Sequence, residues 1–309
     1  MTPELAALLP TKRGVGPSVI ALPAGPWRLV IDYLEYRFPA IPREEIARRM
    51  REGDVRDDRG EWVLPDAAYR AHQKLYYYRH IENEPRIPFD EKILFEDELI
   101  VVADKPHFLP VTPGGRYLQE TLLVRLKRKL GIDALAPMHR IDRETAGLVL
   151  FTKQPHTRGI YQALFSQKTV RKQYEAVARW REDLPLPLEY KSRLVNADHF
   201  MRMREEAGEA NAETRIELIE RRGELARYAL FPVSGKRHQL RVQMAALGLP
   251  ILNDQIYPHH VAAEDLDGDY SRPLQLLAKG IGFRDPVTGS ERIFESEFEL
   301  HTMKTEGSI

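Results

Sequence analysis

The sequence of 309 residues contains no cysteine, which excludes disulfide bonds and every metal site that needs a thiolate. Long hydrophobic runs are also missing, whereas a membrane-spanning helix needs about 20 apolar residues in succession. The amino terminus lacks the basic stretch and apolar core of a secretion signal, so we expect a cytoplasmic location. Hydrophobic residues still make up 43% of the chain, which is enough for one large domain or two unequal ones.

The chain has no net charge, because 46 Lys or Arg residues balance 46 Asp or Glu residues. This balance hides a local excess, since residues 121–180 hold 12 Lys or Arg against 4 Asp or Glu. A basic segment of this kind is typical of a surface that binds a polyanion such as a nucleic acid. For the basic cluster at residues 125–129, a solvated helix face is an equally open interpretation.

A division near residue 88 separates a small amino-terminal extension, residues 1–88, from a larger domain, residues 89–309. Within the extension, residues 29–34 and 43–51 predict two short helices, the second bounded by Pro42 and Gly53. This pattern is similar to a small RNA-binding module that occurs in a ribosomal small-subunit protein. A plain helical extension is the alternative.

Three consecutive tyrosines, Tyr76, Tyr77 and Tyr78, stand near the end of the extension. Tyrosine rings can stack on nucleic-acid bases. Tyrosines in a strand also serve as core residues, because aromatic side chains suit a half-buried sheet. The sequence leaves both interpretations open.

The larger domain alternates short strands with helices. Strands are predicted at residues 93–103 (a hairpin), 146–152, 170–178 and 224–233, and helices at residues 118–130 and 156–166. In the strand at residues 170–178, Lys172 and Tyr174 face the same side because side chains alternate. Ser234 is predicted to cap a further helix that carries Arg237 and Arg241 on one face, near the positive end of its dipole.

The stretch MHRIDRETAGLVLF at residues 138–151 is the most informative part of the chain. It places the carboxylate of Asp142 among closely spaced charged residues and then enters an apolar segment that predicts a buried strand. A polar turn at the edge of a sheet is a common position for catalytic side chains. Taken alone, Asp142 could instead cap a helix or pair with Arg143.

Three segments of the chain resemble motifs of the RluA-type RNA pseudouridine synthase family, in the expected order. HRIDRETAGL at residues 139–148 resembles the family's HRLD signature, and KQYEA at residues 172–176 resembles its Lys-x-Tyr-x-Ala motif. GKRHQLRV at residues 235–242 resembles the family's GRTHQIRV. The resemblance extends over roughly residues 92–290. It implies an α+β fold, with an extended mixed, mainly antiparallel sheet in the catalytic domain and a small amino-terminal extension.

The resemblance also implies roles for individual residues. Asp142 acts as nucleophile or as base at the ribose, Arg241 pairs with it, and Tyr174 stacks on the uracil and accepts or relays the proton lost from carbon 5. The target base must leave its helix, and Arg140 is the candidate to fill the gap. Residues expected to contact the RNA are Arg140, His139, Lys172, Arg237 and Lys105. For His139, a structural hydrogen-bonding role is the alternative.

The reaction isomerises uridine without net redox change, so no cofactor is expected. The sequence also contains neither an HExxH motif nor a GxxxxGK[ST] phosphate loop, so no metal site is expected. The partner implied by the resemblance is ribosomal RNA, transfer RNA or both, bound by a monomer. A protein that keeps the fold and binds RNA without catalysis is the competing hypothesis.

Overall fold

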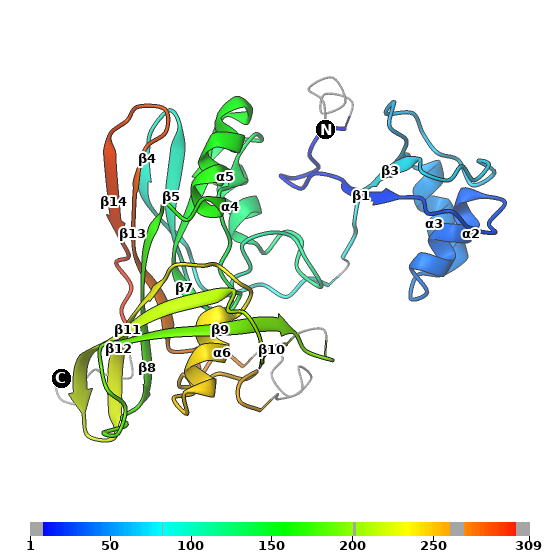
Figure 1. The fold of residues 1–309 in the computed structure, drawn as a ribbon. Coiled ribbons are helices and arrows are strands. Elements are labelled where there is room, and N and C mark those ends of the chain that lie inside the picture. Colours follow the sequence, from blue (N-terminus) through cyan, green and yellow to red (C-terminus); the bar gives the residue numbers. More distant parts are fainter. Residues whose placement is uncertain (1–8, 82, 200–201, 260–268, 301–309) are drawn as a thin grey trace. The chain divides into compact units, whose positions relative to one another are not determined.

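The computed structural model describes residues 9–81, 83–199, 202–259 and 269–300. Two compact units are present (Figure 1). The first comprises Met1–Pro85, Pro113–Gln119 and Val124–Asp133, and the second comprises Arg86–Thr112, Glu120–Leu123 and Ala134–Ile309. The boundary at Pro85 lies close to the division expected near residue 88, but two later segments also belong to the first unit.

The first unit contains two complete helices, most of a third, α4 (Leu122–Leu130), and a small antiparallel sheet. The complete helices are α2 (Val30–Arg37) and α3 (Arg43–Arg51), and the strands β1 (Ser18–Ala21), β3 (Lys74–Tyr77) and β2 (Val55–Arg56) lie in that order. Helix α3 has the predicted bounds. Pro42 precedes its first residue, and Gly53 adopts a positive φ of +75° just after its end, where the helical conformation stops. The apolar faces of both helices pack over Leu75.

The tyrosine cluster belongs largely to the interior of the first unit. Tyr76 and Tyr78 are 6% and 5% exposed, and Tyr77 packs against the core formed by α2 and α3. The Tyr78 hydroxyl donates a hydrogen bond to the Pro10 carbonyl. These contacts favour the interpretation that the tyrosines are core residues.

The second unit is built around one sheet of 11 strands in the order β10-β9-β11-β12-β8-β13-β7-β5-β4, with β14 beside β13 and β6 beside β7. The strands are β4 (Lys92–Glu96), β5 (Ile100–Lys105), β6 (Ala136–Pro137), β7 (Ala146–Thr152), β8 (Arg171–Arg179), β9 (Leu188–Asn196), β10 (Met203–Glu206), β11 (Ala212–Arg222), β12 (Leu225–Pro232), β13 (Leu276–Arg284) and β14 (Glu291–Glu295). All pairs are antiparallel except β13 with β7. The sheet is therefore mixed and mainly antiparallel, and the α+β prediction is confirmed.

Two helices pack on this sheet, and a hydrophobic core forms between each helix and the strands beneath it (Figure 1). Helix α5 (Arg158–Ser166) follows a short 3-10 turn, η1 (Pro155–Thr157), and buries Tyr161 against residues of β5, β7 and β13. Helix α6 (Gln239–Ala246) packs Leu240 and Met244 against β8 and β12. Strand β7, flanked by β5 and β13, is buried along its whole length.

Three predicted helix boundaries are wrong. Helix α2 was expected to end at Leu34 but continues to Arg37. Helix α4 (Leu122–Leu130) begins four residues later than expected. The N–H groups of Leu118 and Gln119 donate to the Glu84 carboxylate in the loop before it. Helix α6 begins after His238, which lies in the left-handed region at φ 53°. Ser234 is therefore not its N-cap, since the Ser234 hydroxyl instead bonds Gln239 Oε1 and accepts the Glu213 N–H.

Within the part of the chain that the structure describes, no helix is long and apolar enough to cross a membrane. Over the same residues, His, Asp and Glu side chains do not form a group of three that could hold a metal ion.

Candidate active site

Asp142 lies in the loop between β6 and β7. The buried strand β7 anchors this loop, and the Thr145 N–H donates to the Asp142 carbonyl at 3.2 Å. The Asp142 side chain is 24% exposed, so it is accessible to a ligand. No helix begins at this position, and Arg143 donates its Nε hydrogen bond to Glu144. The structure thus gives no support to a helix-capping role for Asp142.

Arg241 on α6 reaches across to Asp142, 99 residues earlier in the chain. Its Nη1 donates to Asp142 Oδ2 at 3.2 Å, and its side chain is only 1% exposed. Burial lowers the pKa of this guanidinium, but hydrogen bonds and charge from Asp254, together with the charge of Asp142, outweigh burial and raise it. The buried cation and the Asp142 carboxylate are thus held together as an ion pair at the edge of the sheet.

Tyr174 on β8 lines the same cavity as Asp142 and Arg241. This cavity has a volume of about 930 Å³ and lies in the second unit, within the usual size range for sites that bind small molecules. Burial, followed by the charge of Asp142, raises the pKa of the Tyr174 hydroxyl. At neutral pH the hydroxyl therefore stays protonated, and the ring offers an apolar face to a ligand.

The cavity rim carries several basic side chains. Lys172 lies on the same strand face as Tyr174, as predicted, and donates to the Ser234 carbonyl at 2.8 Å. Burial and the nearby Lys168 lower the pKa of Lys172 to about 8. Arg140 and Arg237 also line the cavity and are exposed. Because α6 begins after His238, Arg237 lies in the preceding loop rather than on one helix face with Arg241.

His139 lines the cavity and is partly exposed, and its ring is fixed by two protein contacts. Its Nε2 accepts the Leu150 N–H at 3.2 Å, and its ring stacks on Phe165 with 4.5 Å between centroids. Burial, together with the charge of Lys172, lowers the pKa of the imidazole to about 3. These contacts match the structural alternative stated for His139.

Lys105, at the end of β5, is fully buried. Its ammonium donates to the carbonyls of Pro106 and Arg143, both at 3.0 Å. Burial lowers its pKa to about 7. Because the Lys105 side chain is 0% exposed, it cannot contact RNA in this structure, and the predicted RNA contact is wrong. Lys105 instead supports the backbone of the loop that carries Asp142.

Comparison with known proteins identifies the family that this chain resembles. The family model for RNA pseudouridylate synthase matches residues 99–246. The chain is 28% identical over 297 residues to ribosomal large subunit pseudouridine synthase C of Pasteurella multocida, covering 90% of this chain and 89% of the relative. It is also 28% identical over 228 residues to the dual-specificity RNA pseudouridine synthase RluA of Haemophilus influenzae, covering 71% of this chain and 97% of the relative. The chain belongs to the RluA-type RNA pseudouridine synthase family.

A solved structure supports the fold assignment of this synthase. The human RNA pseudouridylate synthase domain containing 4 matches with a TM-score of 0.51 at 25% identity, covering 67% of this chain and 88% of that one. The family's enzymes are isomerases, and the enzyme class predicted from the three motifs is confirmed.

Sequence reasoning missed three side chains of the synthase that lie around Asp142 and Arg241. His238 Nε2 lies 3.8 Å from Asp142 Oδ1, and Glu144 Oε2 lies 3.8 Å from Arg241 Nη1. Asp254 binds Arg241 through two hydrogen bonds of 2.8 Å each. His238 stands inside a recognised motif, but no local spacing connects Asp254 to Arg241, because the loop after α6 brings them together.

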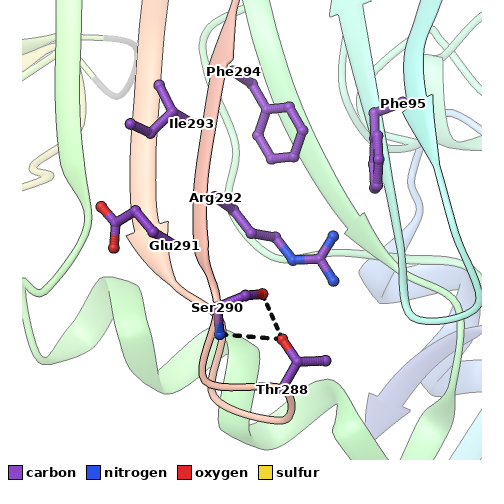
Figure 2. A pocket seen from close by; sticks show the side chains of 7 residues that line it. All are labelled: Phe95, Thr288, Ser290, Glu291, Arg292, Ile293 and Phe294. Atoms are coloured by element: carbon purple, nitrogen blue, oxygen red, sulfur yellow. Dashed lines mark hydrogen bonds between the residues drawn. The ribbon is translucent and has the colours of Figure 1, made fainter.

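A second hollow of the synthase lies beside the β13–β14 hairpin, away from these residues. Figure 2 shows its lining, where the Arg292 guanidinium and the Phe294 ring extend toward Phe95 while Glu291 lies on the other side of the strand. Arg292 forms ion pairs with Asp97 at 2.7 Å and Asp285 at 2.6 Å. The Arg292 guanidinium is therefore paired with two carboxylates of the protein. The lining of this hollow contains no arrangement like that of Asp142, Tyr174 and Arg241.

Proposed function

We propose that the chain converts uridine to pseudouridine in structured RNA at the cavity that contains Asp142, Tyr174 and Arg241. The observation that carries this proposal is the 3.2 Å hydrogen bond from Arg241 to Asp142, formed at a cavity that Tyr174 also lines. A buried arginine holds a carboxylate in a fixed orientation, from which it can attack or abstract a proton. Together, the three side chains provide what the isomerisation requires.

In this reaction the glycosidic bond to nitrogen 1 breaks, the uracil rotates, and carbon 5 bonds to the ribose. Asp142 acts at the ribose, as the nucleophile or as the base. Tyr174 stacks on the uracil. Burial raises the pKa of the Tyr174 hydroxyl and keeps it protonated, so the hydroxyl relays the carbon 5 proton by accepting it as it passes its own proton on. The balance closes at nitrogen 1, which loses its bond to the ribose and carries a proton in the product.

The substrate is proposed to be large-subunit ribosomal RNA, transfer RNA or both. The name of the Pasteurella multocida relative supports the first of these. Arg140, Lys172 and Arg237 line the cavity and are proposed to contact phosphates, with Arg140 also filling the gap left by the extruded base. We further expect the enzyme to act as a monomer in the cytoplasm.

The test compares wild type with Asp142→Asn on transcripts of large-subunit ribosomal RNA and on pooled transfer RNA. We expect Asp142→Asn to form no detectable pseudouridine, while its RNA dissociation constant stays within about 3-fold of wild type, because phosphate contacts supply most of the affinity. Asp183→Asn is the matched control, since Asp183 is an exposed carboxylate paired with Arg181. It should retain full activity.

Pseudouridine formation by Asp142→Asn would refute the role of Asp142. An RNA-binding protein without catalysis predicts a different outcome, in which wild type binds both RNAs and modifies neither. Mapping pseudouridine in cells with and without the gene then identifies the RNA and the position modified.

A further inference from the structure

Asp254 is a buried carboxylate that holds Arg241 from the side opposite Asp142. Its two oxygens accept hydrogen bonds from Nε and Nη2 of Arg241, both at 2.8 Å, and both side chains are 1% exposed. This paired geometry fixes the plane of the guanidinium. It leaves Nη1 as the nitrogen directed at Asp142.

The same carboxylate also anchors the turn that follows it. Asp254 Oδ1 accepts the backbone N–H groups of Ile256 at 2.8 Å and Tyr257 at 3.0 Å. The backbone of Tyr257 is therefore tied to the carboxylate that holds Arg241. Asp254 therefore contacts both the guanidinium and this turn.

The Tyr257 hydroxyl connects the turn to His238. It accepts the Met203 N–H at 2.8 Å and lies 3.0 Å from His238 Nδ1. Among the described residues these are its two hydrogen-bond partners. Donation from the hydroxyl to Nδ1 requires the His238 tautomer that carries its hydrogen on Nε2, and this is the tautomer that the inference below uses.

Nε2 of His238 lies 3.8 Å from Asp142 Oδ1, whereas Arg241 Nη1 lies 3.2 Å from Oδ2. One N–H group thus faces each oxygen of the carboxylate. Burial lowers the pKa of His238, with Arg241 and Arg237 adding to this effect and Asp142 opposing it. The lowered pKa favours the neutral imidazole, whose Nε2 lies near Asp142 Oδ1 but beyond hydrogen-bond distance.

We propose that Asp254 is a positioning residue for the isomerisation, which holds Arg241 directly and His238 through Tyr257 so that the two oxygens of Asp142 each face an N–H donor. The proposal rests on the proposed role of Asp142. Misplacing catalytic groups by about 1 Å can cost 100-fold in rate. Loss of Asp254 should therefore lower turnover far more than it weakens RNA binding.

The chain offers a matched control in Asp285, which makes the same kinds of contact away from the site. Asp285 Oδ1 accepts the N–H groups of Val287 at 2.9 Å and Thr288 at 3.1 Å, and Oδ2 pairs with Arg292 Nε at 2.6 Å. It is also fully buried. Asp285 also accepts a hydrogen bond from the hydroxyl of the buried Tyr161. Asp285→Asn therefore removes a buried carboxylate that is paired with an arginine and anchors a turn, as Asp254→Asn does, at a residue that does not line the cavity.

The first measurement is the single-turnover rate and the dissociation constant on whichever of the two RNA probes the wild type modifies. We expect Asp254→Asn to lower the rate about 100-fold while changing the dissociation constant less than about 3-fold. Tyr257→Phe removes only the hydroxyl and leaves the ion pair between Asp254 and Arg241 in place. It should therefore lower the rate less than Asp254→Asn does. Asp285→Asn should keep the wild-type rate, even if both Asn variants unfold at similarly reduced urea concentrations.

The second measurement needs no RNA. Nitrogen-15 spectra of the imidazole groups, with the His238 signals assigned from a His238→Gln variant, should show the Nε2–H tautomer in wild type and in Asp285→Asn. Asp254→Asn and Tyr257→Phe should shift these signals toward a mixture of tautomers.

A wild-type rate in a folded Asp254→Asn variant overturns the positioning role, as does an equal loss of rate in Asp285→Asn. An Nδ1–H tautomer of His238 in wild type removes the proposed path through Tyr257. A wild type that modifies neither RNA is a separate result, because it overturns the proposed function while the spectra still decide whether Asp254 controls His238.

Discussion

Replacing Gly147 with alanine tests whether the catalytic loop depends on close contact between β7 and β13. Gly147 has φ +107°, and a Cβ placed on it would lie 2.3 Å from the Ala278 carbonyl oxygen and 2.7 Å from the Ala278 nitrogen. Both contacts are with backbone, so no side-chain rotation relieves them. The two strands must separate at the register position that joins Gly147 to Ala278.

The cost has two physical sources. A positive φ costs an alanine about 1–2 kcal/mol, and forcing extra volume into a packed interior typically costs about 1–3 kcal/mol. We therefore expect Gly147→Ala to lower the free energy of unfolding by about 2–5 kcal/mol. Activity should fall as well, because Ala278 is also the register partner of Tyr174 and Lys105 is the partner of Gly147 on β5.

Two other glycines separate these contributions in urea unfolding experiments. Gly223 has φ +61° and open space around the added Cβ, so Gly223→Ala measures the backbone cost alone, about 1–2 kcal/mol. Gly159 lies in α5 with open space and no positive φ, so Gly159→Ala should stabilise by about 0.5–1 kcal/mol. Equal losses in Gly147→Ala and Gly223→Ala would refute the argument from the clash between strands.

Two further predictions concern buried groups that titrate. Because the folded-state pKa of Lys105 is lowered from 10.5 to about 7, the unfolded chain binds the extra proton between these values, and stability rises with pH by up to about 1.4 kcal/mol per pH unit. Urea unfolding at pH 7, 8 and 9 should show this rise in wild type and a smaller one in Lys105→Met, and equal slopes would contradict it. His139, lowered from 6.5 to about 3, should destabilise the fold as pH falls from 6.5 toward 3, because only the unfolded chain gains the proton. In His139→Gln, the free energy of unfolding should fall less between pH 6.5 and pH 3. If the variant loses as much stability over this range as wild type, the argument from the buried imidazole is wrong.

Much of the fold was accessible from local sequence patterns. The bounds of α3 and β7 were predicted correctly, because proline, glycine and an unbroken apolar run mark them within a few residues. The start of α6 was not, because Ser234 has the side chain of an N-cap but bonds to Gln239 and to the neighbouring strand β11 instead. A cap depends on where other segments lie as well as on residue type.

The residues of the active site also fall into those that the sequence predicted and those that only the folded structure brought together. The sequence by itself determined the family and the pairing of Arg241 with Asp142, because three motifs carry these residues in a fixed order. Only the tertiary structure decided that Lys105 is buried beneath the loop and that Asp254 holds Arg241. A buried charge is costly unless it is paired and hydrogen-bonded, and its partners can come from any segment that folding brings close to it. Such contacts join residues that no spacing along the sequence relates, so the environment of Asp142 emerges only once the sheet and α6 are assembled.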